Sequence, residues 1–518
     1  MNLMRAIATV GGFTMVSRVL GFARDILIAA MVGPGLVADA FFIAFKIPNL
    51  FRRLFAEGAF NAGFVPIFSR LADAEGRNAA RAFAAESLAV LVAVLVVLVA
   101  VFEIAMPWLM VGLAPGFVGS PDQFDLAVTL TRITFPYLLF ISVVSLLGGV
   151  LNSVGKFAAV AATPILLNLA LIGALIGLAG VLPTAGHALA WGVAGAGALQ
   201  LIWLGVATAR AGFGLRLGWP RLTPRVRELG RLMLPAVLGS GVAQINIAVD
   251  VIIASLLATG SISYLFFADR LTQLPLGVIG VAVGTALLPL LSRQLGAGDK
   301  EGAQHSLNRA VEVALLLALP AGLALMVASE PVVRVLFERG AFDATSTHAT
   351  AMAVTAYAFG VPAYVLIKVL SPGFFARKDT KTPVRIAIVA LGTNIVLNLA
   401  LMGPLAHVGL ALATALAAWL NAGALAWVLL RRGHWVMDAR LRQRLPRALA
   451  ATLGLGLALW FAIQWLAEPL AGSAAQRTGA LIAVVAAGLV LYGLLAHLSG
   501  AARLGELRAL VQRRDRGT

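Results

Sequence analysis

The sequence contains no cysteine, so it can form no disulfide, no thiolate metal site and no cysteine nucleophile. Charged residues are also scarce, at 12% of the 518 residues, whereas a soluble domain averages about 25%. No polar stretch is long enough to fold as a separate soluble domain. These shortages exclude disulfide and thiolate chemistry, and they exclude a soluble multidomain protein.

The chain consists mainly of apolar residues, arranged in long runs. They make up 60% of the chain, and runs of about 20 residues, each long enough to cross a bilayer, recur from end to end. The first run carries Arg18, Arg24 and Asp25 and lacks a small-residue cleavage site, so we interpret it as a mature helix and not as a signal peptide. The sequence predicts an all-α polytopic membrane protein with about fourteen transmembrane helices. The predicted spans are 7–32, 37–68, 84–112, 126–150, 158–182, 187–209, 232–258, 262–292, 306–329, 347–371, 384–403, 407–430, 447–468 and 478–499.

The distribution of basic residues predicts the orientation. A net charge of +17 would suggest nucleic acid as the partner of a soluble protein, but here most lysines and arginines lie in short loops. Loops on one side are basic, whereas the opposite loops hold only Arg334, Arg339 and Arg477. By the positive-inside rule, both termini are cytoplasmic in a multi-pass protein of the cell inner membrane. No nucleic-acid partner is expected.

An internal repeat divides the chain into two halves of about six helices each. Residues 24–30 align with 249–255, and Phe41-Phe42 aligns with Phe266-Phe267 at the same offset. Because the number of helices in each half is even, the halves share one orientation, and a substrate site is expected between them. The predicted parts are an N-terminal lobe (1–210), a cytoplasmic amphipathic linker helix (211–231), a C-terminal lobe (232–432), and a last part with helices 13 and 14 and a basic tail (433–518).

Charged residues crowd into the first, second and eighth predicted helices, although each costs roughly 2.5–3.5 kcal/mol at the centre of a membrane. They are Arg18, Arg24, Asp25, Asp39, Lys46, Arg52, Arg53, Glu57, Asp269 and Arg270. For Asp39, which lies near a helix end, ion pairing or snorkelling accounts for the charge in the membrane. A binding role accounts for it equally well. Ion pairing or snorkelling is a poor explanation for Arg18, Arg52 and Arg53, near mid-depth. The set predicts a cationic cavity, because the planar fork of arginine suits the oxygens of a diphosphate.

Several motifs resemble those of one transporter family. They are SRVLGFARD at residues 17–25, IPNLFRRLFAEGAF at 47–60, LFERGAF at 336–342 and FFARKDTKTP at 374–383. They look like the MurJ (MviN) lipid II flippase family, related to MATE-like transporters of the MOP superfamily, and the resemblance covers essentially the whole chain. It implies two lobes around a V-shaped cavity. The implied substrate is lipid II, an undecaprenyl-diphosphate-linked disaccharide pentapeptide, carried from the cytoplasmic to the periplasmic leaflet.

The resemblance also implies roles for residues. Arg18, Arg24, Arg52 and Arg270 match cavity arginines of the family, with Asp39 as an acidic partner. Helices 13 and 14 resemble those that form a groove for the polyprenyl tail. Some members have a sodium site, whose matching positions here are Asp250, Asn394, Asn398 and Thr414. Asn398 departs from the pattern, because a carboxylate would be the stronger ligand there. Two roles explain Asp250 equally well. It can be a sodium ligand, or it can be a carboxylate that is hydrogen-bonded between helices.

The function predicted from these features is transport by alternating access, driven by the membrane potential, an ion gradient or both, with no enzymatic activity. No cofactor is expected beyond a sodium ion; the expected partners are lipid II, membrane lipids and cell-wall synthesis proteins. One alternative is an exporter of another lipid-linked oligosaccharide, or a MATE-like drug antiporter, which would have an acidic cavity. Another is a polyprenyl-phosphate enzyme, which would need a catalytic base or metal carboxylates at a membrane face. A third is a scaffold, which would tolerate neutral replacements of the arginines.

Overall fold

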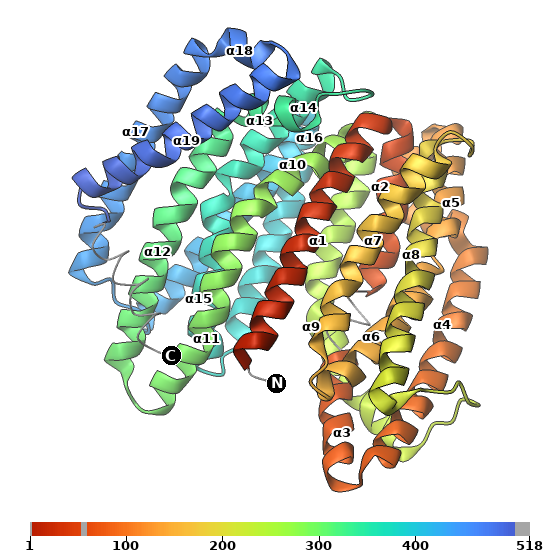
Figure 1. Ribbon diagram of the computed structural model, residues 1–518. Helices are drawn as coiled ribbons and strands as arrows, with labels where there is room; N and C mark the ends of the chain where they lie inside the picture. The colour runs from red at the N-terminus through yellow and green to blue at the C-terminus, as the bar shows by residue number, and fades with distance from the viewer. Residues whose placement is uncertain (1–2, 53–59, 503–518) are drawn as a thin grey trace. The chain divides into compact units, whose positions relative to one another are not determined.

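The computed structural model describes residues 3–52 and 60–502, and nearly all of them are helical (Figure 1). No strand occurs within these ranges. Nine helical segments of the described chain are long and apolar enough to cross a membrane. The all-α polytopic fold predicted from the sequence is confirmed.

The chain folds into two compact units. The first comprises Met1–Ser263 with Arg339–Phe342, and the second comprises Tyr264–Glu338 with Asp343–Thr518. Before the boundary lie α1 (Leu3–Met31), α2 (Leu36–Arg52), α3 (Asn61–Ala74), α4 (Arg77–Leu113), η2 (Pro115–Gly119), α5 (Pro121–Thr134), α6 (Tyr137–Ser153), α7 (Phe157–Leu178), α8 (Ala185–Thr208), η3 (Ala209–Phe213) and α9 (Pro224–Ser255). After α10 (Ser261–Pro275), in which the chain passes from one unit to the other, come η4 (Leu276–Gly280), α11 (Val281–Gly296), α12 (Lys300–Val327), α13 (Ser329–Phe337), α14 (Ala344–Phe359), α15 (Val361–Phe375), α16 (Lys381–Arg431), α17 (Ala439–Trp465), α18 (Ala467–Ala471) and α19 (Ala474–Leu498).

Two spans predicted as continuous helices are broken near their middle. The span 126–150 is divided between α5 and α6 at Phe135-Pro136, and the span 347–371 is divided between α14 and α15 at Gly360. Each break lies beside a proline, Pro136 before α6 and Pro362 in the first turn of α15, which is where the ring is best tolerated. The two spans are the fourth of each predicted half, so the shared interruption supports the internal repeat.

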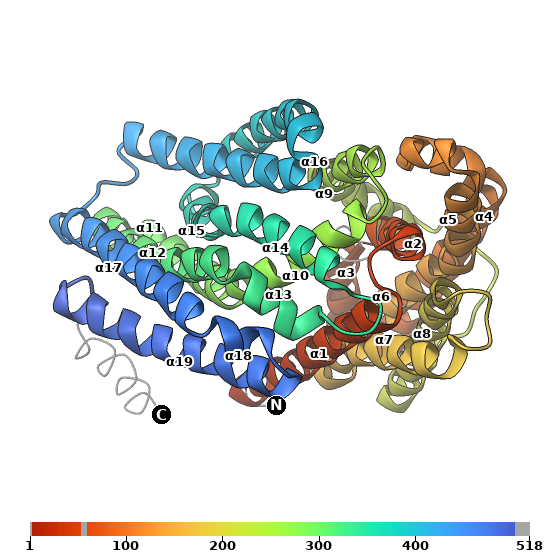
Figure 2. The same ribbon diagram turned by 90° about the horizontal axis from the view of Figure 1, so that it is seen from above.

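Helix α16 contains a reversal at the predicted connection between the spans 384–403 and 407–430. Ala406 has a positive φ of 47° and interrupts the helix there. Across the turn, Asn394 Nδ2 donates to Thr414 Oγ1 at 3.4 Å, so the two arms run side by side (Figure 2). The arms correspond to the predicted spans 384–403 and 407–430.

The linker predicted as a surface helix is not helical over residues 214–223, and α9 begins only at Pro224. The prediction of a helix is therefore wrong for this segment. Pro220 and Pro224 disfavour the helical conformation at Trp219 and Thr223, the residues directly before them, and Thr223 is extended.

The linker is held instead by side chains of α4. Arg81 Nε donates to the Gly214 carbonyl oxygen at 2.9 Å, and Thr223 Oγ1 donates to Glu86 Oε2 at 2.8 Å. Helix α9 continues from the linker and packs against α3 and α4. These contacts explain why α9 belongs to the first unit and why the units divide after it.

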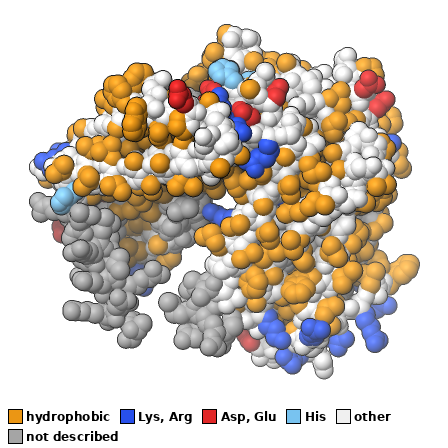
Figure 3. Space-filling model, turned by 45° about the horizontal axis from the view of Figure 1, so that its top comes forward, with side chains coloured by type: hydrophobic (Ala, Val, Ile, Leu, Met, Phe, Trp, Pro, Cys, Tyr) orange, Lys and Arg blue, Asp and Glu red, His pale blue; other side chains and the backbone are white. Residues whose placement is uncertain are grey.

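Basic side chains gather at the end of the first unit where α3 and α4 meet (Figure 3). Arg70, Arg77, Arg81 and Arg227 are exposed there. Hydrophobic side chains cover the flanks of the helices in the same view. This separation is the one that a bilayer requires, with apolar flanks in lipid and basic ends at the headgroups.

Two glycines of the first unit permit a close approach of two turns. The N–H of Ala341 donates to the Ala30 carbonyl oxygen at 2.8 Å. Gly33 and Gly340 both have positive φ, and a Cβ on Gly340 would lie 2.2 Å from that same Ala30 oxygen. The glycine of the LFERGAF motif is thus required by packing.

Candidate functional site

A buried charged cluster lies on α1. Arg24 is 6% exposed and Asp25 is 2% exposed. The Arg24 guanidinium donates to Asp25 Oδ1 from Nη2 at 2.7 Å and from Nε at 3.0 Å. From α7, Asn168 Oδ1 accepts from Arg24 Nη1 at 3.0 Å. The described partners therefore use three of the five guanidinium N–H groups.

Asn168 holds this cluster in place from the neighbouring helix. Its Nδ2 donates to the Ser17 carbonyl oxygen at 3.0 Å, so its amide binds α1 at two levels. Our sequence reasoning missed Asn168. A signal was present, because a polar amide in the middle of the apolar span 158–182 needs a partner within the membrane.

The remaining basic candidates of the first unit lie on α1 and α2. Arg18 is exposed and lies almost two turns before Arg24. Lys46 and Arg52 are half-buried, and Arg52 Nε donates to Asn49 Oδ1 at 3.1 Å. Arg53 and Glu57 lie outside the described residues.

Asp39 caps the beginning of α10. It is 1% exposed, and its Oδ2 accepts from the Gly260 N–H at 2.6 Å. Its Oδ1 accepts from the Ser263 N–H at 2.9 Å and from Ser263 Oγ at 2.5 Å. A carboxylate in this position satisfies free N–H groups of the first turn and faces the positive end of the helix dipole. These hydrogen bonds give Asp39 a structural role at the beginning of α10. From the sequence we considered snorkelling and a role as an acidic partner in a cavity, and we did not predict this contact.

The candidates of the second unit lie on α10. The Arg270 guanidinium lies over the Phe266 ring, 4.8 Å from its centroid, and both residues are half-buried. Asp269 Oδ2 accepts from Gln273 Nε2 at 2.5 Å. The cation–π contact orients the guanidinium from within its own helix.

The predicted sodium ligands are divided between the units. In the first, Asn246 Nδ2 donates to Asp250 Oδ2 at 3.3 Å. In the second, the two buried amides of α16 are bonded to each other, with Asn398 Nδ2 donating to Asn394 Oδ1 at 3.1 Å. Amide, hydroxyl and carboxylate oxygens are chemically suited to a hard cation such as sodium.

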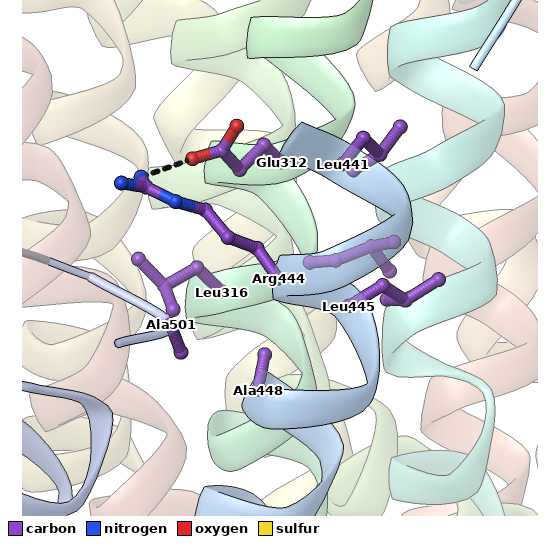
Figure 4. Close-up of a pocket in the computed structure, with 8 residues that line it drawn as sticks. Glu312, Leu316, Leu441, Arg444, Leu445, Ala448 and Ala501 are labelled. Carbon is purple, nitrogen blue, oxygen red and sulfur yellow. Dashed lines mark hydrogen bonds and ion pairs between the residues drawn. The ribbon is translucent and has the colours of Figure 1, made fainter. Parts of the chain in front are cut away.

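Sequence reasoning also missed a buried carboxylate, Glu312, which joins α12 to α17. It is 8% exposed and accepts from Arg444 Nη1 at 2.7 Å (Figure 4) and from Arg440 Nη2 at 3.1 Å. Arg309, on the same helix as Glu312, pairs with both Glu312 and Asp438. Helix α19 packs in turn on α17 (Figures 1 and 2). Glu312 therefore anchors the C-terminal helices to the rest of the second unit.

We expect Glu312→Ala to destabilise the protein by roughly 3–5 kcal/mol, because it removes the carboxylate from a mostly buried group of arginines. Thermal unfolding of the purified protein in detergent would measure the loss. Glu330→Ala is the matched control, since that carboxylate pairs with Arg334 at 2.7 Å but is 42% exposed, and we expect it to cost less than about 1 kcal/mol. Equal melting temperatures for the two variants would contradict the anchoring role.

The motif at 374–383 forms a hydrogen-bonded turn before α16. Asp379 accepts from the Thr382 N–H at 3.0 Å, from Thr382 Oγ1 at 2.7 Å and from Arg432 Nη1 at 2.8 Å. The hydrogen bonds from Thr382 in particular lower the pKa of Asp379 from 3.8 to about 2. The charged carboxylate is thus the form that the folded protein favours.

This shift predicts a pH dependence of stability. Because the folded pKa lies below the unfolded one, the contribution of Asp379 is complete above 3.8 and is lost as the pH falls towards 2. We expect Asp379→Ala to lower stability at pH 7 by about 1 kcal/mol, as for the loss of a helix cap. The difference from the parent protein should shrink between pH 4 and pH 3 in thermal unfolding, as the parent's carboxylate begins to protonate. A constant difference would show that Asp379 acts through packing and not through its charge.

Known proteins match this chain over almost its full length. A family model described as "Lipid II flippase MurJ" matches residues 28–478. A "Probable lipid II flippase MurJ" of Rhizobium meliloti (strain 1021) is 44% identical over 521 residues, which cover 99% of this chain and 97% of the relative. The "Lipid II flippase MurJ" of Burkholderia cenocepacia is 38% identical over 500 residues and 96% of each chain.

Solved structures agree with the fold. A structure titled "Lipid II flippase MurJ, inward closed conformation" has a TM-score of 0.77 and 26% identity, and it covers 94% of this chain and 98% of its own. An inward-facing MATE family transporter of the MOP superfamily has a TM-score of 0.65 at 13% identity, covering 83% of this chain and 98% of its own. The fold related to MATE transporters, expected from the motifs, is confirmed.

Proposed function

The chain belongs to the lipid II flippase MurJ family, and from that premise we propose how its own residues carry the substrate. The family model covers residues 28–478, and one relative is 44% identical over nearly the whole chain. The protein is a lipid II flippase of the membrane. Its function is transport, and we infer that none of its residues catalyses a chemical reaction.

The diphosphate of lipid II is bound by arginines on α1, α2 and α10. The observation that carries this proposal is the buried guanidinium of Arg24, fixed by Asp25 on α1 and by Asn168 on α7. A guanidinium held in one orientation presents its remaining N–H groups to phosphate oxygens at little entropic cost. Arg18, Arg52 and Arg270 supply further positive charge for the same headgroup.

Transport proceeds by alternating access. The headgroup enters a cavity open to the cytoplasm, and rearrangement of the lobes then exposes it to the periplasm. The polyprenyl tail stays in lipid and slides along α17 and α19, whose outward faces are apolar, with Leu457 and Val490 each about two-thirds exposed. The protein lies in the inner membrane with both termini cytoplasmic, beside the cell-wall synthesis proteins that use its product.

The membrane potential drives the step. Moving two negative charges outward across 100 mV, negative inside, yields about 4.6 kcal/mol at roughly 2.3 kcal/mol per charge. Lipid II transport into the outer leaflet of cells is therefore expected to fall when an ionophore collapses the potential. Unchanged transport after the collapse would rule out this coupling.

A sodium ion bound by Asp250, Asn394, Asn398 and Thr414 resets the carrier. Three of these four ligands are neutral, so the ion is held weakly and is released easily. Replacing external sodium by choline should slow transport in the parent protein and leave an Asp250→Asn variant unaffected. Equal rates of the parent protein with and without sodium would leave the potential as the only driving force.

The function is tested in cells whose own flippase can be shut off. Lipid II in the outer leaflet is scored by its cleavage with an added, membrane-impermeant hydrolase. We expect this protein to restore cleavage. If it is abundant in the membrane and no cleavage returns, the cargo is another lipid-linked oligosaccharide.

A further inference from the structure

The first unit contains a cavity that is distinct from the charged cluster. Its volume is about 260 Å³, just below the roughly 300–1,000 Å³ of small-molecule sites. Helices α4, α6 and α9 line it together with the linker. The lining is apolar, with Leu91, Leu95, Leu229 and Met233 among its residues.

Two serine hydroxyls interrupt this apolar lining. Ser87 of α4 is 3% exposed and Ser142 of α6 is 2% exposed. Among the residues that the structure describes, neither Oγ has a hydrogen-bond partner. A buried hydroxyl without a partner is unfavourable by about 1–3 kcal/mol, so two in one cavity indicate a ligand that accepts hydrogen bonds.

The cavity opens at exposed apolar residues of α4 and the linker. Val94 and Leu222 line it and are also 57% and 63% exposed, so the opening lies between α4 and the linker. Beyond Val94, the exposed face of α4 continues with Val97 and Val101. This apolar face of α4 gives an apolar chain a route from the bilayer into the cavity.

Ser87 stands at the junction between the charged beginning of α4 and its apolar run. It directly follows Glu86, and α4 then has no charged residue until Glu103. Glu86 itself holds the linker through Thr223 at 2.8 Å. The residue after the last charge of a spanning helix marks the boundary between headgroups and hydrocarbon.

We propose that this cavity binds one acyl chain of a membrane glycerophospholipid, with ester oxygens accepting hydrogen bonds from Ser87 and Ser142. The volume admits a single chain and not a whole lipid. A polyprenyl chain is a poorer occupant, because it carries no acceptor for the two hydroxyls. The site does not depend on the flippase function. A lipid bound there contacts the linker, α4 and α6 together.

The test uses the full-length protein in nanodiscs that contain phosphatidylcholine with a diazirine on one acyl chain. After irradiation, mass spectrometry of peptides should place cross-links on α4 between Ser87 and Leu98 and on α6 near Ser142. In Ser87→Ala/Ser142→Ala, cross-linking there should fall about fivefold for each hydrogen bond lost. Ser153→Ala is the matched control, since its hydroxyl donates to the Gly149 carbonyl oxygen of α6 at 2.8 Å.

A second measurement separates lipid binding from folding. In lipid-free detergent, the double alanine variant should be at least as stable as the parent, because it removes two unsatisfied hydroxyls. Added phosphatidylcholine should raise the melting temperature of the parent more than that of the variant. Leu91→Trp, which fills the cavity, should abolish cross-linking to α4 and α6 while cross-links to α17 and α19 persist.

Three results would overturn the proposal. One is the absence of cross-links on α4 and α6 in the parent protein. The second is equal cross-linking in the parent and the double variant. The third is displacement of the phospholipid probe by undecaprenyl diphosphate, which would make the cavity a tail site of the substrate.

Discussion

Arg24→Ala is expected to lower lipid II transport on the order of a hundredfold, because a charge-assisted, bidentate contact to phosphate is worth about 3 kcal/mol. Arg24→Lys should restore only part of the rate, since an ammonium keeps the charge but loses the fork. The measurement is cleavage of outer-leaflet lipid II by the impermeant hydrolase, normalised to the amount of protein in the membrane. Arg70→Ala serves as the control, because that arginine is 63% exposed and pairs with Glu228 at the end of the unit.

A loss of transport in Arg24→Ala alone has two explanations. The variant also leaves the Asp25 carboxylate buried without its guanidinium, which can destabilise the protein by 3–5 kcal/mol. The pair Arg24→Gln/Asp25→Asn removes both charges and should recover most of the melting temperature. If transport stays low in this double variant, Arg24 acts on the substrate. If transport returns with stability, the cluster is structural and the proposed diphosphate contact is wrong.

The fold could be predicted because each membrane helix can be recognised separately from its own composition. Each apolar run of about 20 residues satisfies its own backbone, so span positions follow from composition without knowledge of the partners. The reversal at Ala406 was predictable for the same reason, since Gly403 and Pro404 separate two such runs. The breaks inside the spans 126–150 and 347–371 were not, because each half-helix remains apolar and hydropathy averages over the interruption.

The candidate site was predicted less completely, because its residues are defined by their partners. Composition singles out Arg24 as a costly charge in a membrane, and it is indeed buried. Composition cannot show that Asn168 orients it, since the two residues are 144 positions apart. Glu312 was missed for a related reason. It stands near the beginning of the predicted span 306–329, where a carboxylate would ordinarily reach water, and its burial results from arginines contributed by α17.

Asp39→Ala is expected to destabilise the protein by roughly 2–5 kcal/mol. The carboxylate accepts three hydrogen bonds, from the Gly260 N–H and from the N–H and Oγ of Ser263, and each buried donor left without an acceptor costs about 1–3 kcal/mol. The substitution also removes a negative charge from the beginning of α10. Thermal unfolding in detergent measures the effect. Asp39→Asn should be intermediate, because one amide oxygen still accepts while its NH₂ faces a backbone donor.

Ser263→Ala separates this role from participation in substrate binding. It removes one hydrogen bond and leaves both backbone donors on Asp39, so we expect a loss of only about 1 kcal/mol and normal transport. Transport per folded molecule should likewise be retained in Asp39→Asn at a temperature where the variant is folded. A variant with the parent's melting temperature but without transport would contradict the structural role and support Asp39 as an acidic partner of the cavity arginines. Because the carboxylate is 1% exposed and its described hydrogen bonds all hold the beginning of α10, the structural outcome is the one we expect.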